Sequence, residues 1–275
     1  MISNVFELGC ALFPFTEKIT DRIMRTSHTK LKYKDKGEGQ LQTELDRSFD
    51  ALLYQFVETH DPGYEIISEE SAPEVGTIKN AWIFDPLDGT QNTAMGTPMF
   101  GIALMRVDKG HVTMGAIFLP ARRLMGASGL YVAGTGQGAW EYSSTYGDDD
   151  RKLMCSTQTD LAKSTMLIEG PSKSALMHPA VQKLIDKSQR SRVDLSATWS
   201  TILVASGGLQ TKGADFLVTV KNKLWDNLPM CLFIEEAGGK VTDLEGNPWS
   251  LENYANLLCT NSLLHMQALQ TIENM

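Results

Sequence analysis

The sequence is poor in cysteine, in basic start signals and in long hydrophobic runs. Its four cysteines, Cys10, Cys155, Cys231 and Cys259, are scattered without a Cys-x-x-Cys pair. Neither a zinc site nor a disulfide framework is therefore predicted, and a reducing cytoplasm fits best. No uninterrupted apolar run approaches the ~18 residues of a membrane-spanning helix, and the N-terminal segment lacks the basic residues of a secretory signal. We expect a soluble, cytoplasmic protein with no membrane partner.

Positive charge is also scarce. The chain has 25 Lys and Arg against 33 Asp and Glu, for a net charge of -8, so no sequence-wide positive field exists to hold a nucleic-acid polymer. A small phosphate ester can still bind if metal ions or helix N-termini neutralise the repulsion locally. With 275 residues, 42% of them hydrophobic, the chain has the composition of one globular domain or two tightly joined halves.

The hydrophobic period changes along the chain. Spacings of three or four predict helices at 12–23 and 45–56, the second capped by Thr43. Short apolar runs predict strands at 64–68, 81–85, 100–107, 112–119, 130–133 and 139–142. Beyond an acidic turn at 147–150, strands at 166–168, near 193, at 216–220, 240–242 and 257–259 alternate with helices at 179–188, 197–206, 228–237 and the C-terminus. We expect one domain over 1–275, with an N-terminal metal-binding half (1–146) of helices and antiparallel sheet and an alternating α/β half (151–275).

The most informative segment is Asp-Pro-Leu-Asp-Gly-Thr at residues 85–90. An apolar strand delivers Asp85 to its C-terminal end, where Pro86 cannot continue the ladder, and Asp88 follows three residues later. Two converging carboxylates repel each other unless one keeps its proton or a hard cation binds both. An EF-hand would need Glu where Gly96 stands, and the haloacid dehalogenase motif has one residue between its aspartates. For this segment alone, a turn without a ligand remains the alternative.

Two further acidic elements accompany this segment. Glu69-Glu70 closes an earlier strand, and Trp225-Asp226 precedes a helix far downstream. Separately, they have ordinary explanations as a surface charge pair and a helix N-cap. Together with Thr43-x-x-Asp46 and the Glu-Ala-Gly-Gly at 236–239, they resemble the motifs of the inositol monophosphatase family of metal-dependent, lithium-sensitive phosphatases, over nearly the full chain. The resemblance implies an α+β fold, the layered αβαβα sandwich of the sugar-phosphatase type, and a homodimer.

The resemblance also implies a site with two or three Mg²⁺ ions. Glu70, Asp85 and the Leu87 carbonyl would hold a first ion, which activates the attacking water. Asp85, Asp88 and Asp226 would hold a second, which stabilises the leaving-group oxygen, and Asp226 would thereby let the C-terminal half complete the site. Two cations suit phosphoryl transfer because the reaction needs in-line positioning and cancellation of charge.

Further roles follow from the same resemblance. Asp46 and Thr90, with Glu70, are the expected catalytic residues, and Asp46 and Thr90 would orient and deprotonate the water. Backbone N–H groups of Gly89 and Thr90 would bind phosphate oxygens. The expected substrate contacts are Asp88, Gly89, Thr90, Ser172, Lys173, Ser196, Ala197, Thr219 and Asp226.

The substrate side departs from the family pattern. Leu195 stands where familiar members have a glycine, and Thr219 where members that bind inositol phosphate have a glutamate. Lys173, Lys221 and Lys223 would favour a substrate with a second negative group if they face the site. We therefore expect a sugar or polyol phosphate other than myo-inositol 1-phosphate. Histidinol phosphate and adenosine 3′,5′-bisphosphate are the alternative substrates, and a non-catalytic, metal-binding regulatory protein is the alternative of a different class.

Overall fold

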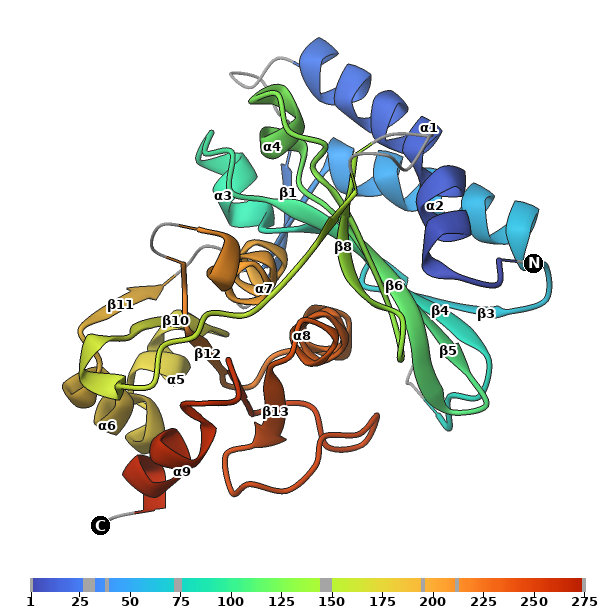
Figure 1. Cartoon of the computed structure of the whole chain (residues 1–275). Helices are drawn as coiled ribbons and strands as arrows, with labels where there is room; N and C mark the ends of the chain where they lie inside the picture. Colours follow the sequence, from blue (N-terminus) through green and yellow to red (C-terminus); the bar gives the residue numbers. More distant parts are fainter. Residues whose placement is uncertain are drawn as a thin grey trace.

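Two β-sheets with a helical layer between them form the framework of the protein, seen in a computed structural model (Figure 1). The structure describes residues 2–26, 33–37, 40–71, 76–143, 150–193, 196–210 and 213–273. The expected turn at 147–150 lies outside these residues except for Asp150.

The larger sheet has seven strands in chain order. It is antiparallel throughout, except that its first two strands run parallel. Its members are β3 Glu65–Ser68, β4 Ala81–Asp88, β5 Gly101–Asp108, β6 His111–Phe118, β7 Leu130–Gly134, β8 Gly138–Tyr142 and β9 Arg151–Lys152. Because β9 pairs with β8, this sheet extends to Lys152, beyond the residue 146 at which we expected the N-terminal half to end.

The smaller sheet has five strands in the order β11-β10-β12-β14-β13. Its members are β10 Thr165–Glu169, β11 Arg190–Val193, β12 Phe216–Thr219, β13 Lys240–Asp243 and β14 Leu257–Thr260. The strands β10, β11 and β12 are parallel, while β14 is antiparallel to both of its neighbours. The alternation expected for the C-terminal half is thus confirmed, and β14 is the strand that runs opposite to the other four.

Helices form the three other layers (Figure 1). On the outer face of the larger sheet lie α1 Val5–Arg25 and α2 Glu44–His60, and the outer face of the smaller sheet is covered by α5 Ser172–Leu176, α6 Pro179–Lys187 and α9 His265–Glu273. The middle layer is formed by α7 Ala197–Ala205 and α8 Leu224–Glu236. The structure also describes the hairpin of β1 Tyr33–Gly37 and β2 Gln40–Thr43, the helices α3 Thr90–Ala94 and α4 Pro120–Leu124, and short 3-10 helices at Leu161–Lys163 and Gly207–Leu209. The five layers confirm the predicted αβαβα sandwich.

Packing explains the character of each helix. α1 buries one face, with Leu8, Leu12 and Ile19 against the sheet, as its spacing predicts. By contrast, α8 is buried on nearly every side and contacts strands of both sheets. A helix that is apolar on all sides has no amphipathic period. The sequence pattern therefore does not mark the first turn of α8.

Two predicted boundaries were wrong, and both affect the candidate site. The helix expected at 228–237 begins four residues earlier at Leu224, so Asp226 lies in its first turn and accepts the Lys223 N–H at 3.1 Å. The strand expected to end at Asp85 continues to Asp88 through a break in register between the two aspartates. Pro86 occupies that break, where no ladder hydrogen bond is required.

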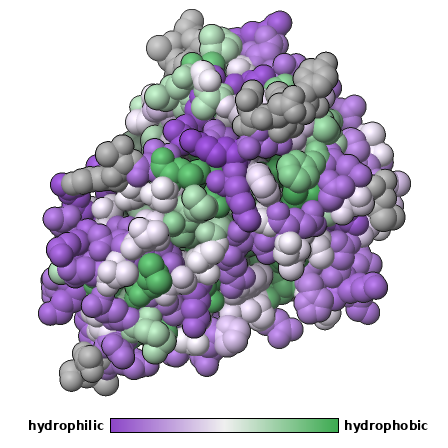
Figure 2. Space-filling model, in the orientation of Figure 1, coloured by the Kyte–Doolittle hydropathy of each residue, from purple (hydrophilic) through white to green (hydrophobic). Residues whose placement is uncertain are grey.

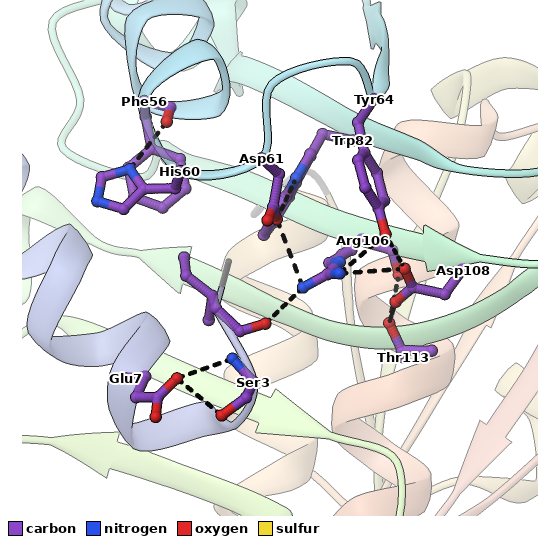
Figure 3. A network of polar contacts seen from close by, with 11 residues as sticks. Ser3, Glu7, Phe56, His60, Asp61, Tyr64, Trp82, Arg106, Asp108 and Thr113 are labelled. Atoms are coloured by element: carbon purple, nitrogen blue, oxygen red, sulfur yellow. Dashed lines mark hydrogen bonds and ion pairs between the residues drawn. The ribbon is translucent and has the colours of Figure 1, made fainter.

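A buried arginine ties the N-terminal segment to the larger sheet, at the end of β4 remote from Asp88 (Figure 3). Arg106 donates to the Ile2 carbonyl at 2.6 Å and to the Tyr64 hydroxyl at 2.9 Å. It also forms ion pairs with Asp61 at 3.4 Å and Asp108 at 3.2 Å. This network anchors β4 at one end, while the acidic motif occupies the other.

Hydrophilic residues cover most of the molecular face in Figure 2, and hydrophobic residues appear on it as small separate patches. None of the helices in the described ranges combines the length and the apolar character that crossing a membrane requires.

Candidate active site and metal centre

Three aspartates from opposite parts of the chain converge on one point. Asp85 and Asp88 come from the last residues of β4, and Asp226 comes from the first turn of α8. One carboxylate oxygen of each lies within 4.8 Å of the others. Asp85 is 2% exposed and Asp88 8% exposed. The break in register within β4 brings both of its aspartates to the same side, because two residues there interrupt the strict alternation of a strand.

Burial and mutual repulsion dominate the electrostatics of this cluster. Burial, followed by the negative charges of Glu69, Asp88 and Asp226, raises the pKa of Asp85 well above its ordinary value. Burial, then the charges of Asp88 and Glu69, raises the pKa of Asp226 in the same way. Carboxylates so placed are unfavourable together without a counterion. An all-oxygen donor set in this arrangement fits a hard divalent cation such as Mg²⁺.

Glu69, rather than Glu70, faces this cluster. β3 pairs with β4 with Ser68 opposite Phe84, and the Glu69 N–H continues the ladder to the Phe84 carbonyl at 3.2 Å, so Glu69 comes beside Asp85. The negative charge of Glu69 is, after burial, the next cause that raises the pKa of Asp85. Glu70 instead accepts a hydrogen bond from Gln42. The assignment of the glutamate ligand to Glu70 is therefore off by one residue.

Asp88 connects the larger sheet to the middle helical layer. Its carboxylate accepts hydrogen bonds from the Ala197 N–H at 3.3 Å and from the Thr198 N–H and hydroxyl, each at 2.6 Å. Burial raises the pKa of Asp88, and these hydrogen bonds oppose the rise. The bonds hold both Asp88 oxygens against the start of α7, Oδ1 through Ala197 and Oδ2 through Thr198, which fixes the direction of the carboxylate. Thr198 was not predicted as a partner of Asp88.

A second polar group lies beside the cluster and contains Asp46 and Thr90. The Thr90 hydroxyl lies 3.0 Å from Asp46 Oδ1 and 3.1 Å from the Leu87 carbonyl oxygen. Asp46 Oδ2 accepts the Thr43 N–H at 2.7 Å and the Thr43 hydroxyl, which completes the capping box of α2. Burial is the largest cause that raises the pKa of Asp46, and the negative charge of Glu70 raises it by a smaller amount. The structure thus brings together the threonine, the aspartate and the carbonyl singled out from the sequence.

A pocket of about 260 Å³ opens next to the aspartates. Asp88, Gly89 and Asp226 line one part of it, and its other lining residues include Ser196, Ala197 and, unforeseen from the sequence, Glu169 and Asn222. Gly89 has φ +92°, and a Cβ there would lie 2.8 Å from the Met99 carbonyl oxygen. Only glycine fits this position readily, both in conformation and in space.

Thr219 does not reach this pocket, so its assignment as a substrate contact was wrong. Its side chain is fully buried, and its hydroxyl accepts hydrogen bonds from Asn227 at 3.0 Å and from the Leu257 N–H at 3.3 Å. It lies on the face of β12 that α8 covers, where Asn227 belongs to that helix. The neighbouring strand β10 pairs Glu169 with Thr219, and it is Glu169 that lines the pocket.

The three lysines considered from the sequence are exposed and are not among the residues that line the pocket in the described part of the chain. They are Lys173, Lys221 and Lys223. Ser172 begins α5, but its side chain lies outside the described structure, as does Leu195. Ser196 has φ +132°, a backbone conformation that favours glycine.

These features define the class of protein. An αβαβα sandwich with an acidic, oxygen-only site between the end of β4 and the start of α8 is the architecture of a sugar-phosphatase-type enzyme. The model of the inositol monophosphatase family matches residues 9–275, and the chain belongs to this family. It is accordingly a phosphoric monoester hydrolase.

Individual relatives are distant in sequence. A fructose-1,6-bisphosphatase/inositol-1-monophosphatase of Thermotoga maritima is 27% identical over 241 residues, which cover 87% of this chain and 85% of the relative. The Nus factor SuhB of Salmonella typhimurium is 28% identical over 216 residues, covering 77% of this chain and 74% of the relative. Among solved structures, an IMPase/NADP phosphatase with Mg²⁺ and phosphate is similar, with a TM-score of 0.76, 21% identity, and coverage of 95% of this chain and 93% of that one.

Proposed function

We propose that the protein hydrolyses a small polyol or sugar phosphate in a Mg²⁺-dependent reaction with a metal-activated water. The observation that carries this proposal is the convergence of three aspartate oxygens within 4.8 Å at the edge of a pocket. The Mg²⁺ and phosphate named for the structurally similar IMPase/NADP phosphatase support the choice of ion.

The proposed metal ligands follow the structure where it departs from the sequence analysis. Glu69, Asp85 and the Leu87 carbonyl would hold one ion, with Glu69 taking the place that we first gave to Glu70. Asp85, Asp88 and Asp226 would hold a second, and a third ion would lie near the two glutamates. Bound Mg²⁺ supplies charge neutralisation and lowers the pKa of a bound water.

The residues of the chain have separate tasks in this proposal. The Thr90 hydroxyl, placed between Asp46 and the Leu87 carbonyl, would orient the attacking water, and Asp46 would take its proton. The N–H groups of Gly89 and Thr90 at the start of α3 would bind phosphate oxygens. Asp88, held by α7, would stay fixed as charge develops on the leaving oxygen.

We further propose that the enzyme is a cytoplasmic homodimer, on the basis of its family resemblance and of cysteines that are all free. The alternatives are a phosphatase of histidinol phosphate or adenosine 3′,5′-bisphosphate, and a non-catalytic regulatory protein. Because one of the relatives is a Nus factor, the regulatory alternative should be tested as well.

The test is phosphate release from a panel of phosphate esters, with and without Mg²⁺. Asp88→Asn should lower turnover at least ~10²-fold, because the variant loses several kcal/mol of charge stabilisation. Asp160→Asn, at an exposed carboxylate of the loop before β10, is the control and should keep full activity. Because Asp88 accepts three hydrogen bonds, its variant must also be checked by thermal melting. A fully active Asp88→Asn protein, or equal release in excess chelator, would refute the proposal.

A further inference from the structure

The pocket contains a carboxylate that the proposed metal site does not use. Glu169 is the last residue of β10, is 8% exposed, and lines the pocket together with Asp88 and Asp226. Its Oε1 accepts a hydrogen bond from the Ser200 hydroxyl and lies 3.4 Å from the donating Ser196 N–H. Both donors belong to the N-terminal part of α7, so Glu169 is held in place as a hydrogen-bond acceptor.

The charge balance of the pocket makes this residue important. Glu69, Asp85, Asp88 and Asp226 together carry the charge that two divalent cations neutralise, and Glu169 adds a further negative charge. No lysine or arginine belongs to the pocket lining within the described residues. The side of the pocket away from the metal site therefore remains negative when the metal site is filled.

Local backbone geometry places a neutral partner beside Glu169. Gly170 has φ +119°, and a Cβ there would collide with the Val220 carbonyl oxygen and lie 3.3 Å from Asn222 Oδ1. The glycine thus lets the end of β10 approach the turn after β12, and this turn carries Asn222 to the pocket. Glu169 and Asn222 form a wall suited to hydroxyl or ammonium groups, because a carboxylate accepts hydrogen bonds from both.

We propose that Glu169 is a specificity-determining residue, which selects phosphate monoesters whose alcohol part is neutral or cationic and rejects those with a second anionic group. This inference rests on the proposed phosphatase function. An anion that enters the pocket would meet a buried like charge, and like-charge juxtaposition is a strong means of rejecting the wrong ligand. This inference replaces the expectation that Lys173, Lys221 and Lys223 would favour a substrate with a second negative group.

The test uses three linear substrates that differ only at the carbon remote from the phosphate. They are 1-amino-1-deoxyglucitol 6-phosphate, glucitol 6-phosphate and gluconate 6-phosphate. The wild-type kcat/KM should be at least about tenfold higher for the first two than for gluconate 6-phosphate. Glu169→Gln keeps the size of the side chain and an acceptor for Ser200 but removes the charge, so it should lower this preference about tenfold.

Glu141→Gln is the matched control. Glu141 is 9% exposed, lies on β8 and pairs with Arg151, so its replacement removes a similarly buried charge outside the pocket and should leave the preference unchanged. Asn222→Lys provides a second variant if Glu169→Gln does not fold. Its added positive charge should raise the kcat/KM for gluconate 6-phosphate relative to glucitol 6-phosphate.

Calorimetric binding of unphosphorylated glucitol and gluconate supplies a readout besides activity, and glucitol should bind more tightly to the wild type. The inference is overturned if the wild type treats the neutral and anionic compounds alike, or if Glu169→Gln keeps the wild-type preference. Absence of hydrolysis of every ester would instead refute the proposed function, while the binding comparison would still decide the role of Glu169.

Discussion

Replacing Asp226 by asparagine should stabilise the metal-free protein while it abolishes the stabilisation produced by Mg²⁺. Asp226 lies in the first turn of α8, and its carboxylate accepts the Lys223 N–H at 3.1 Å, a bond that an amide oxygen can also accept. What the variant removes is a negative charge close to Asp85 and Asp88. The same substitution therefore has opposite effects on the metal-free and metal-bound proteins.

The magnitude follows from the spacing of the carboxylates. Two unit charges at the 4.8 Å limit of the cluster repel by about 3.5 kcal/mol at an effective dielectric constant of about 20. The cluster avoids part of this repulsion by keeping a proton, as the raised pKa of Asp226 indicates, with burial the main cause and the charges of Asp88 and Glu69 next. We expect a net gain of about 1–3 kcal/mol at pH 8, or roughly 2–4 °C in Tm for each kcal/mol.

The stability that Asp226→Asn gains over the metal-free wild type should increase as the pH rises. A carboxyl group whose pKa is raised by folding contributes stability below its unfolded pKa, about 3.9 for aspartate. That contribution is lost as the pH rises through the folded pKa. The metal-free wild type should thus lose stability above pH 4, and Asp226→Asn should lose less.

Thermal melting at pH 5, 6.5 and 8 measures this effect, in excess chelator and in Mg²⁺. Mg²⁺ at 100 times its dissociation constant should stabilise the wild type by about 2.7 kcal/mol and the variant by much less. Asp108→Asn is the control and should lower the stability of the metal-free protein. Asp108 accepts hydrogen bonds from Thr113 and Tyr64 and pairs with Arg106, so its charge is favourable. A metal-free Asp226→Asn protein that melts below the wild type at pH 8 would refute the reasoning.

Three other predictions test neighbouring features. Lithium should inhibit phosphate release at fixed Mg²⁺ in the millimolar range where sodium does not, and equal effects of the two ions would show that the inhibitor profile of the family does not transfer. Thr219→Glu should lower the free energy of unfolding by about 3 kcal/mol, because it buries an unpaired carboxylate; an unchanged melting curve would place that side chain in the pocket after all. Ser196→Gly should raise the unfolding free energy by about 1 kcal/mol, measured in urea, since it relieves a φ of +132°. A loss instead would mean that the Ser196 hydroxyl bonds to Thr198 and Trp199 outweigh the strain.

Local patterns sufficed for most of the elements. The helix capped by Thr43 and the first six strands of the larger sheet were predictable because alternation, turns and a cap lie within a few residues of one another, whereas the short strand β9 was not predicted. The start of α8 was missed because the helix is buried on nearly all sides, so no change of period marks its first turn. Asp226 was consequently taken for a residue that precedes the helix.

Within the site, pairing between distant strands decided what local patterns could not. Glu69 and Glu70 are adjacent and identical, and only the register of β3 on β4 shows which of them meets Asp85. Thr219 and Glu169 are paired on β12 and β10 and lie on the same face of the smaller sheet, yet Thr219 is buried against α8 while Glu169 lines the pocket. The strand sequences cannot show this difference, because it is set by the helices that pack on each position, α7 on Glu169 and α8 on Thr219.

The position of α8 also bears on how the chain folds as the ribosome makes it. All seven strands of the larger sheet have been translated once Lys152 emerges, but the helix that contacts the inner face of β4–β8 ends only at Glu236. During the interval, a nascent chain displays a broad apolar sheet surface with nothing to cover it, a state prone to aggregation. This surface is covered only when α8 is complete, so we expect a chain that ends before residue 236 to be insoluble rather than a folded half.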